Sequence, residues 1–383
     1  MLRLGLPSTC FPARTERGGR PLHQRDALID LTRGLLFLLM THSHALALAH
    51  VSVDSFWQSG YWLPRGWATV CFILLSGYTV GFLLPWQGHQ AVTRTKLLRR
   101  GRDLLVVMFV SNVVFLALDH VATGSPGVLL QWHWWLGLVT FETPSSISAI
   151  LLPTGVLLLI APLLLTMEEA HPAWFLGLVV LGTVGVAWAQ VSMASRLHRR
   201  LLTLLLDGER LGVPVLLFLA YGSLGMAVGR LSRRWPTRRL GLVVTGVTGF
   251  ALLQSLHHFS PHSAVVHVLC SSLLPPTQLA VVMSVSWMLL ATRWQPMAGF
   301  FRLMGFYALF AFVVHRILLQ TIHLGLNALQ VGDARCQYLL LGAGTMLLTF
   351  CLCWWRHYHA ASLRPRTTPG LNMATTSFLL VRS

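Results

Sequence analysis

The chain has 383 residues, of which 54% are apolar and only 11% charged, whereas soluble domains carry about 25% charged residues. This composition predicts an all-α, polytopic membrane protein and excludes a soluble globular enzyme. Lys and Arg outnumber Asp and Glu by 29 to 12, which gives a formal net charge of +17. Without a soluble domain to carry a basic face, we attribute this charge to the positive-inside distribution and expect no nucleic-acid partner.

Ten segments have the length of about 20 mainly apolar residues that crosses a lipid bilayer. We therefore expect about ten transmembrane helices in one membrane domain over 28–356, with cytoplasmic tails at 1–27 and 357–383. The predicted spans are 28–48, 64–86, 103–123, 147–167, 172–192, 211–230, 239–257, 274–292, 303–322 and 336–355.

Basic residues set the orientation of the spans. They precede the first span, follow the tenth, and fill the second-to-third, sixth-to-seventh and eighth-to-ninth loops, so alternating spans place both termini in the cytoplasm. Two loops do not follow this distribution of basic residues. The fifth-to-sixth loop carries four arginines, from Arg196 to Arg210, on the predicted outer side. The fourth-to-fifth loop, on the predicted cytoplasmic side, carries Glu168 and Glu169 without Lys or Arg. The first segment also resembles a signal peptide, but Asp30 and Arg33 interrupt it, and we favour an uncleaved helix.

Ionisable residues lie along one face of the first span. At about 100° per residue, Arg33 and His44 are roughly 20° apart around the helix and about 16 Å apart along it, and Asp30 lies on the same face. His42 is nearly opposite Arg33. Such groups are costly in a membrane and by default mark function. The structural alternative is that Asp30 and Arg33 anchor the helix end by snorkelling, while His44 satisfies a core hydrogen bond.

Two later spans carry further candidates. Ser76 precedes Gly77, and Gly81 follows one turn later; small residues of this kind let membrane helices approach closely, and Ser76 is a nucleophile only with a base in reach. The ninth span contains His315, which is either a satisfied core histidine or part of the same site.

Together these segments resemble the membrane acyltransferase superfamily. RDALIDLTRGL (25–35) followed by His44 is similar to its opening, in which an arginine and a histidine are separated by ten residues, as Arg33 and His44 are. FILLSGYTVGFL (72–83) resembles its second-helix motif, the cluster from Lys96 to Arg102 its arginine-rich cytoplasmic loop, and LMGFYALFAFVVH (303–315) its late helix ending in histidine. The nearest branch is the OpgC-type glucan succinyltransferases of the bacterial inner membrane, followed by the acyltransferase family 3 proteins.

The resemblance implies transfer of an acyl group, succinyl or acetyl, from cytoplasmic acyl-CoA as co-substrate to a hydroxyl of an extracytoplasmic glycan. It implies no bound cofactor or metal. His44 is then the catalytic histidine, and Arg33, Arg99 and Arg102 favour the donor's phosphates. Asp30 pairs with Arg33 at i+3, while Ser76 and His315 complete the substrate-binding set.

Two positions depart from the family pattern. Val70 stands where the family often has an acidic residue, six positions before the serine, and the late motif lacks its usual serine near Phe306 or Tyr307. One alternative function is a multi-pass transporter that uses Asp30, Arg33 and the histidines as a path for a proton or small anion. Another is a non-catalytic membrane subunit.

Overall fold

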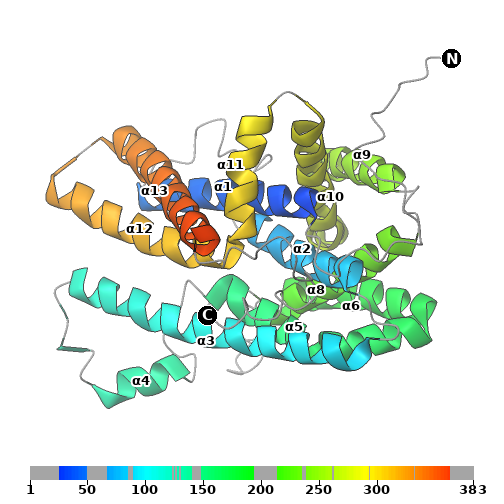
Figure 1. The fold of residues 1–383 in the computed structure, drawn as a ribbon. Coiled ribbons are helices and arrows are strands. Elements are labelled where there is room, and N and C mark those ends of the chain that lie inside the picture. Colours follow the sequence, from blue (N-terminus) through cyan, green and yellow to red (C-terminus); the bar gives the residue numbers. More distant parts are fainter. Residues whose placement is uncertain are drawn as a thin grey trace, which may run out of the picture.

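The computed structural model describes residues 26–49, 67–84, 89–122, 125, 127–128, 131–139, 148–193, 214–234, 239–260, 263–292, 294–331 and 333–362. Regular structure within these ranges is helical (Figure 1). The helices are α1 (Ala27–Leu48), α2 (Trp67–Leu83), α3 (Gln90–Ala122), α4 (Trp132–Val139), α5 (Ser148–Ala170), α6 (Pro172–Met193), α8 (Val215–Arg234), α9 (Arg239–Phe259), α10 (Ala264–Ala291), α11 (Gln295–Phe306), α12 (Ala308–Ala328) and α13 (Ala334–Ser362).

Within the described ranges, seven helices are long and apolar enough to cross a membrane: α3, α5, α6, α8, α10, α12 and α13. The chain is therefore a polytopic helical membrane protein, with fewer such helices than the ten spans expected. Shorter apolar stretches lie in α2 and α9. All ten predicted spans nevertheless overlap a helix.

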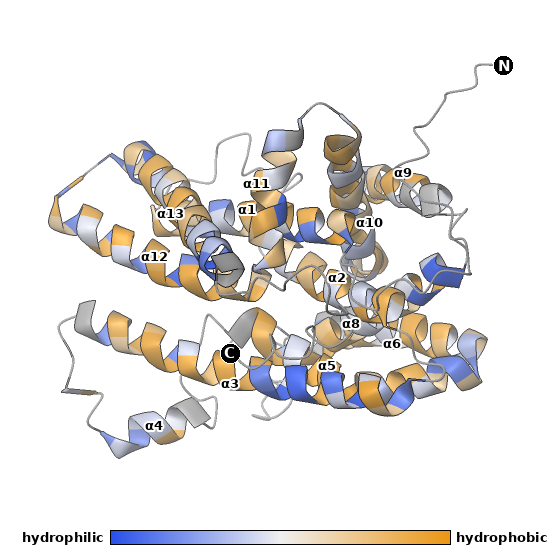
Figure 2. Ribbon diagram, in the orientation of Figure 1, coloured by the Kyte–Doolittle hydropathy of each residue, from blue (hydrophilic) through white to orange (hydrophobic). Residues whose placement is uncertain are grey.

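Three predicted boundaries are wrong. The cluster from Lys96 to Arg102 is not a loop: it belongs to α3, whose Lys, Arg and Leu residues are good helix formers. Figure 2 shows hydrophilic residues along the first half of this helix and hydrophobic ones beyond. The predicted span 303–322 is divided at Tyr307 into α11 and α12, just after Gly305, a residue type that weakens helix interiors. The last helix, Ala334–Ser362, continues beyond the end of the predicted span at 355.

Other predictions fall on segments outside the described residues. These are the N-terminal basic cluster, the arginines from Arg196 to Arg210, and the tail after Ser362.

One end of the bundle collects charged side chains, and we call it the basic end. Here α1 begins and α2, α5 and α8 finish: Arg33 near the start of α1 donates to Thr79 Oγ1 near the end of α2 at 3.0 Å, and Arg233 at the end of α8 donates to the Leu84 carbonyl at 2.9 Å. Alternating spans would likewise place the beginning of the first predicted span on the same side as the ends of the second, fourth and sixth.

Helix α1 lies inside the bundle and packs against α2, α10, α11, α12 and α13. Asp26 caps its first turn by accepting a hydrogen bond from the Leu28 amide at 2.9 Å. Helix α12 runs parallel to α1, because His315 lies beside Phe37 and His44, and Leu319 packs with Ala45 farther along. Helix α13 runs in the opposite direction, since Leu341 packs near Leu319 and Arg356 lies over Phe310 near the start of α12.

Glycines bring α2 and α8 into backbone contact. A Cβ on Gly77 would overlap the carbonyl oxygen of Gly222, and one on Gly81 would overlap that of Met226. From the other side, a Cβ on Gly225 would overlap the Leu74 carbonyl oxygen. The packing role expected for Gly77 and Gly81 is therefore confirmed, as is usual for small residues between membrane helices.

Glu168 is a buried residue of α5, not part of a cytoplasmic loop. Its carboxylate lies 3.3 Å from Arg230 Nε and 2.8 Å from Arg234 Nη2, both at the end of α8. The positive charges that neutralise Glu168 thus come from α8 and not from the α5–α6 connection, which has no Lys or Arg.

Replacing Glu168 with Gln should lower the free energy of unfolding by about 3 kcal/mol, because the change leaves two arginines without their carboxylate. Thermal unfolding in detergent measures this loss. The neighbouring Glu169→Gln is the control and should cost much less, since its side chain is more exposed and forms no ion pair of this kind within the described ranges. Equal losses in the two variants would contradict the prediction.

Candidate active site

The first part of the candidate site is a polar cluster near the start of α1. Asp30 Oδ1 lies 3.5 Å from Arg33 Nη1, which confirms the pairing expected at i+3, and the Asp30 side chain is only 4% exposed. Thr79 of α2 accepts a hydrogen bond from Arg33 Nη2 at 3.0 Å. Because the carboxylate and the threonine hold the guanidinium from two helices, Arg33 has a fixed position rather than a freely snorkelling one.

The backbone of α11 closes over this cluster. A Cβ on Gly305 would overlap the carbonyl oxygen of Asp30, and one on Gly34 would overlap that of Phe301. The hydroxyl oxygens of Thr32 and of Ser286 on α10 also lie 3.0 Å apart. The start of α1 is thus held by α2, α10 and α11 together.

The second part is a pair of imidazoles farther along α1. The rings of His44 on α1 and His315 on α12 lie 5.9 Å apart between centroids, with planes inclined by 27°. His315 is fully buried and packs edge-on against Phe37 at 4.9 Å. Two histidines that are 271 positions apart in the chain therefore meet at one place in the bundle.

Arg316 adds a cation beside the imidazole pair. Its charge is close enough to act on both His44 and His315. The guanidinium lies over the Phe115 ring of α3, 5.2 Å from the ring centroid. Arg316 therefore contacts α3, while the imidazoles themselves meet between α1 and α12.

His42 faces away from this pair. Its Nδ1 lies 2.6 Å from the hydroxyl of Tyr338 on α13, and the two rings meet edge to face. The helical wheel placed His42 nearly opposite Arg33, and the structure accordingly directs it to a different neighbouring helix from that of His44.

The remaining predicted residues lie apart from the imidazoles. Ser76 donates its hydroxyl to the Phe72 carbonyl of its own helix at 2.8 Å, which occupies the proton that a nucleophilic serine would have to give to a base. Arg99 and Arg102 are exposed on α3 and both interact with Asp103. They form a surface cluster near the basic end rather than part of the buried site.

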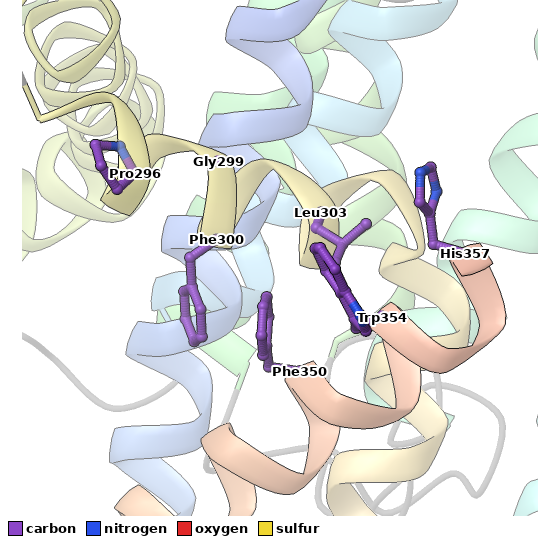
Figure 3. Close-up of a pocket in the computed structure, with 7 residues that line it drawn as sticks. All are labelled: Pro296, Gly299, Phe300, Leu303, Phe350, Trp354 and His357. Carbon is purple, nitrogen blue, oxygen red and sulfur yellow. The ribbon is translucent and has the colours of Figure 1, made fainter.

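A separate pocket of about 430 Å³ lies between α11 and α13 (Figure 3). None of the predicted site residues lines it. Within it the rings of Phe300 and Phe350 are stacked, with their centroids 4.4 Å apart. Its lining residues are Pro296, Gly299, Phe300, Leu303, Phe350, Trp354 and His357. No group of three or more His, Cys, Asp or Glu residues in the described part of the chain is placed to hold a metal ion.

Sequence reasoning missed Arg316 and Tyr338. Arg316 follows His315 directly, and the rule that flags ionisable residues inside a span applied to it as well. Tyr338 gives no such signal, because a tyrosine near a span end is common at membrane interfaces.

No family model matches the chain, and neither does a curated protein or a solved structure. Its function must therefore be argued from the residues that α1, α2 and α12 bring together.

Proposed function

We propose that this chain is a membrane O-acyltransferase that moves an acyl group, succinyl or acetyl, from cytoplasmic acyl-CoA to a hydroxyl of an extracytoplasmic glycan. The observation that carries the proposal is the contact of the His44 and His315 rings inside the bundle. His44 is on α1, the same helix that carries Arg33, whose guanidinium is held by Asp30 and Thr79. Imidazole is the natural proton acceptor near neutral pH, and acyl transfer to an alcohol requires one.

In this proposal α1, α2 and α9 also cross the bilayer, which brings the number of spans to about ten. The basic end faces the cytoplasm of a bacterial inner membrane, and both termini lie there. Arg33 and the exposed Arg99 and Arg102 supply positive charge on the side where a polyphosphate donor arrives.

The imidazole pair lies deeper, on the extracytoplasmic side of Arg33. An imidazole takes the proton of the acceptor hydroxyl while the oxygen bonds to the acyl carbon and the carbon–sulfur bond breaks. The departing thiolate then takes the proton. Separate positions for the donor's phosphates and for the acid–base group suit a reaction whose substrates come from opposite sides.

Purified protein in proteoliposomes tests this proposal. Radiolabelled succinyl-CoA or acetyl-CoA is placed on the side of the basic end and a soluble glucan on the other, and the glucan is analysed by mass spectrometry. We expect a mass increase of one acyl group that depends on the protein. Uptake of labelled anion without any acylated glucan would instead support a transporter.

A further inference from the structure

The pocket between α11 and α13 is formed by residues that the proposed acyl transfer does not use. Its volume of about 430 Å³ falls within the roughly 300–1,000 Å³ of small-molecule sites. Figure 3 shows Pro296 at one end of the pocket and His357 at the other. The stacked rings of Phe300 and Phe350 lie between these ends. The walls are therefore apolar along most of their length, with an imidazole at one end.

The pocket opens on an exposed apolar stripe of α13. Trp354 lines the pocket, and Leu347 and Leu340 precede it at intervals of seven residues, which is about two helical turns. These three side chains are 58%, 61% and 46% exposed. Helix α13 is long and apolar enough to cross a membrane, and exposed apolar side chains of such a helix face lipid tails. The pocket is therefore accessible to lipid.

The imidazole end of the pocket points toward the basic end of the bundle. Beyond the stacked rings, the hydroxyl of Tyr307, which directly follows α11, lies 3.4 Å from Nδ1 of His357 on α13. Both helices therefore run in the same direction from the ring pair to this contact. Gly305, two residues before Tyr307, packs against the backbone of Asp30 near the start of α1. The polar end of the pocket thus lies near the polar cluster of Arg33.

Positive charge accompanies this polar end. The guanidinium of Arg356, the residue before His357, lies over the rings of Tyr307 and Phe310, 5.7 Å and 4.9 Å from their centroids. Arg302 is also exposed on α11. Helices α11, α12 and α13 contain no Asp or Glu, and neither arginine forms an ion pair within the described part of the chain. No carboxylate there neutralises this charge.

We propose that this pocket binds an anionic phospholipid, with one acyl chain along the aromatic walls and the phosphate at Arg356 and His357. An apolar channel that ends in cations matches an amphiphile with a negative head. A sugar would leave most of its hydroxyls without partners, because only His357 and Trp354 offer polar side-chain atoms to it. A second copy of the chain, meeting through the same face, would bring the same positive charges. The inference does not depend on the proposed acyl transfer.

Photo-crosslinking of the full chain in liposomes tests the choice of headgroup. Phosphatidylglycerol and phosphatidylcholine with the same diazirine-bearing acyl chain are compared, and mass spectrometry measures labelling of the pocket relative to labelling of the exposed helix α6. We expect phosphatidylglycerol to label the pocket about fivefold more than phosphatidylcholine, the preference that one arginine near an anionic lipid provides. Arg356→Gln should bring this ratio close to one. Arg335→Gln, at the opposite end of α13, is the control and should leave the ratio unchanged.

A second variant fills the pocket itself. Gly299 lines the pocket, and a Cβ added to it meets nothing within 4 Å, so the side chain of Gly299→Leu occupies the pocket without displacing the protein. Labelling of Phe350 and Trp354 should then fall severalfold. Gly182→Leu in α6 is the matched control, because a Cβ at Gly182 also meets nothing within 4 Å but lies outside the pocket. Leucine favours helix more than glycine does, so both variants should fold.

Three results would overturn the inference. Equal labelling of the wild-type pocket by both lipids would show that no headgroup is selected. Unchanged labelling of Phe350 and Trp354 in Gly299→Leu would place the acyl chain elsewhere. A pocket that neither lipid labels, although α6 is labelled, would show that a second copy or another segment of the chain covers it. The wild-type comparison of the two lipids requires no variant, so it decides the headgroup question even if a substitution impairs folding.

Discussion

His44→Ala is expected to lower the rate of acyl transfer by about 10²–10⁴-fold, the range that removal of an acid–base group produces. The imidazole of His44 lies against that of His315 within the bundle, so its loss removes one of the two paired rings. The change does not touch the ion pair of Asp30 and Arg33 or the glycine contacts of α2 and α8. Folding and membrane insertion should therefore persist, and initial rates of acyl transfer in proteoliposomes measure the loss.

His42→Ala is the matched control on the same helix. His42 bonds to Tyr338 of α13 and does not contact His315 within the described structure, so we expect this variant to keep most of the activity. It should lose some thermal stability, since Tyr338 is left without its partner. Equal activity of His44→Ala and the wild type, at equal amounts of inserted protein, would remove His44 from the site.

Gly77→Ala is expected to destabilise the fold by about 1–3 kcal/mol, the usual cost of forcing extra atoms into a close-packed interior. The added methyl group would overlap the carbonyl oxygen of Gly222, and backbone cannot move aside as a flexible side chain does. Helices α2 and α8 must separate instead. Because Thr79 on α2 helps to hold Arg33, the variant should also weaken activity in the protein that remains folded.

Gly182→Ala in α6 is the control for this packing effect. Nothing lies within 4 Å of a Cβ added at Gly182, and alanine favours helix more than glycine does, so stability should be unchanged or slightly higher. Thermal unfolding of both variants in the same detergent provides the comparison. A Gly77→Ala protein as stable as Gly182→Ala would show that α2 and α8 do not pack through their glycines.

Hydropathy predicted where the helices lie but not where every helix begins or is divided. The apolar half of α3 was found because it is long and uncharged, whereas the basic half from Arg94 to Arg102 has helix propensity without hydropathy. The division at Tyr307 was missed because both α11 and α12 are apolar around it. Glu168 was assigned to a loop because its counter-ions, Arg230 and Arg234, are distant in the sequence.

The candidate site was predictable only along a single helix. Helical periodicity was enough to place Asp30 beside Arg33 and to direct His42 away from His44, because these relations depend only on the rotation per residue. Which helix faces His44 depends on the packing of α1 against α12, and no local pattern in the sequence reports that packing. The motif around Ser76 made it a candidate site residue. Its hydrogen bond to the Phe72 carbonyl depends on the side-chain rotamer, which the sequence does not determine.

Because α1 is uninterrupted, the number of residues between Arg33 and His44 fixes the distance and the rotation between the two parts of the site. A single residue inserted between Leu35 and Met40 would turn His44 by about 100° relative to Arg33 and displace it by about 1.5 Å. Its imidazole would then leave α12 even though every original side chain was still present. The apolar segment between the guanidinium and the imidazole thus tolerates changes of side chain far better than changes of length.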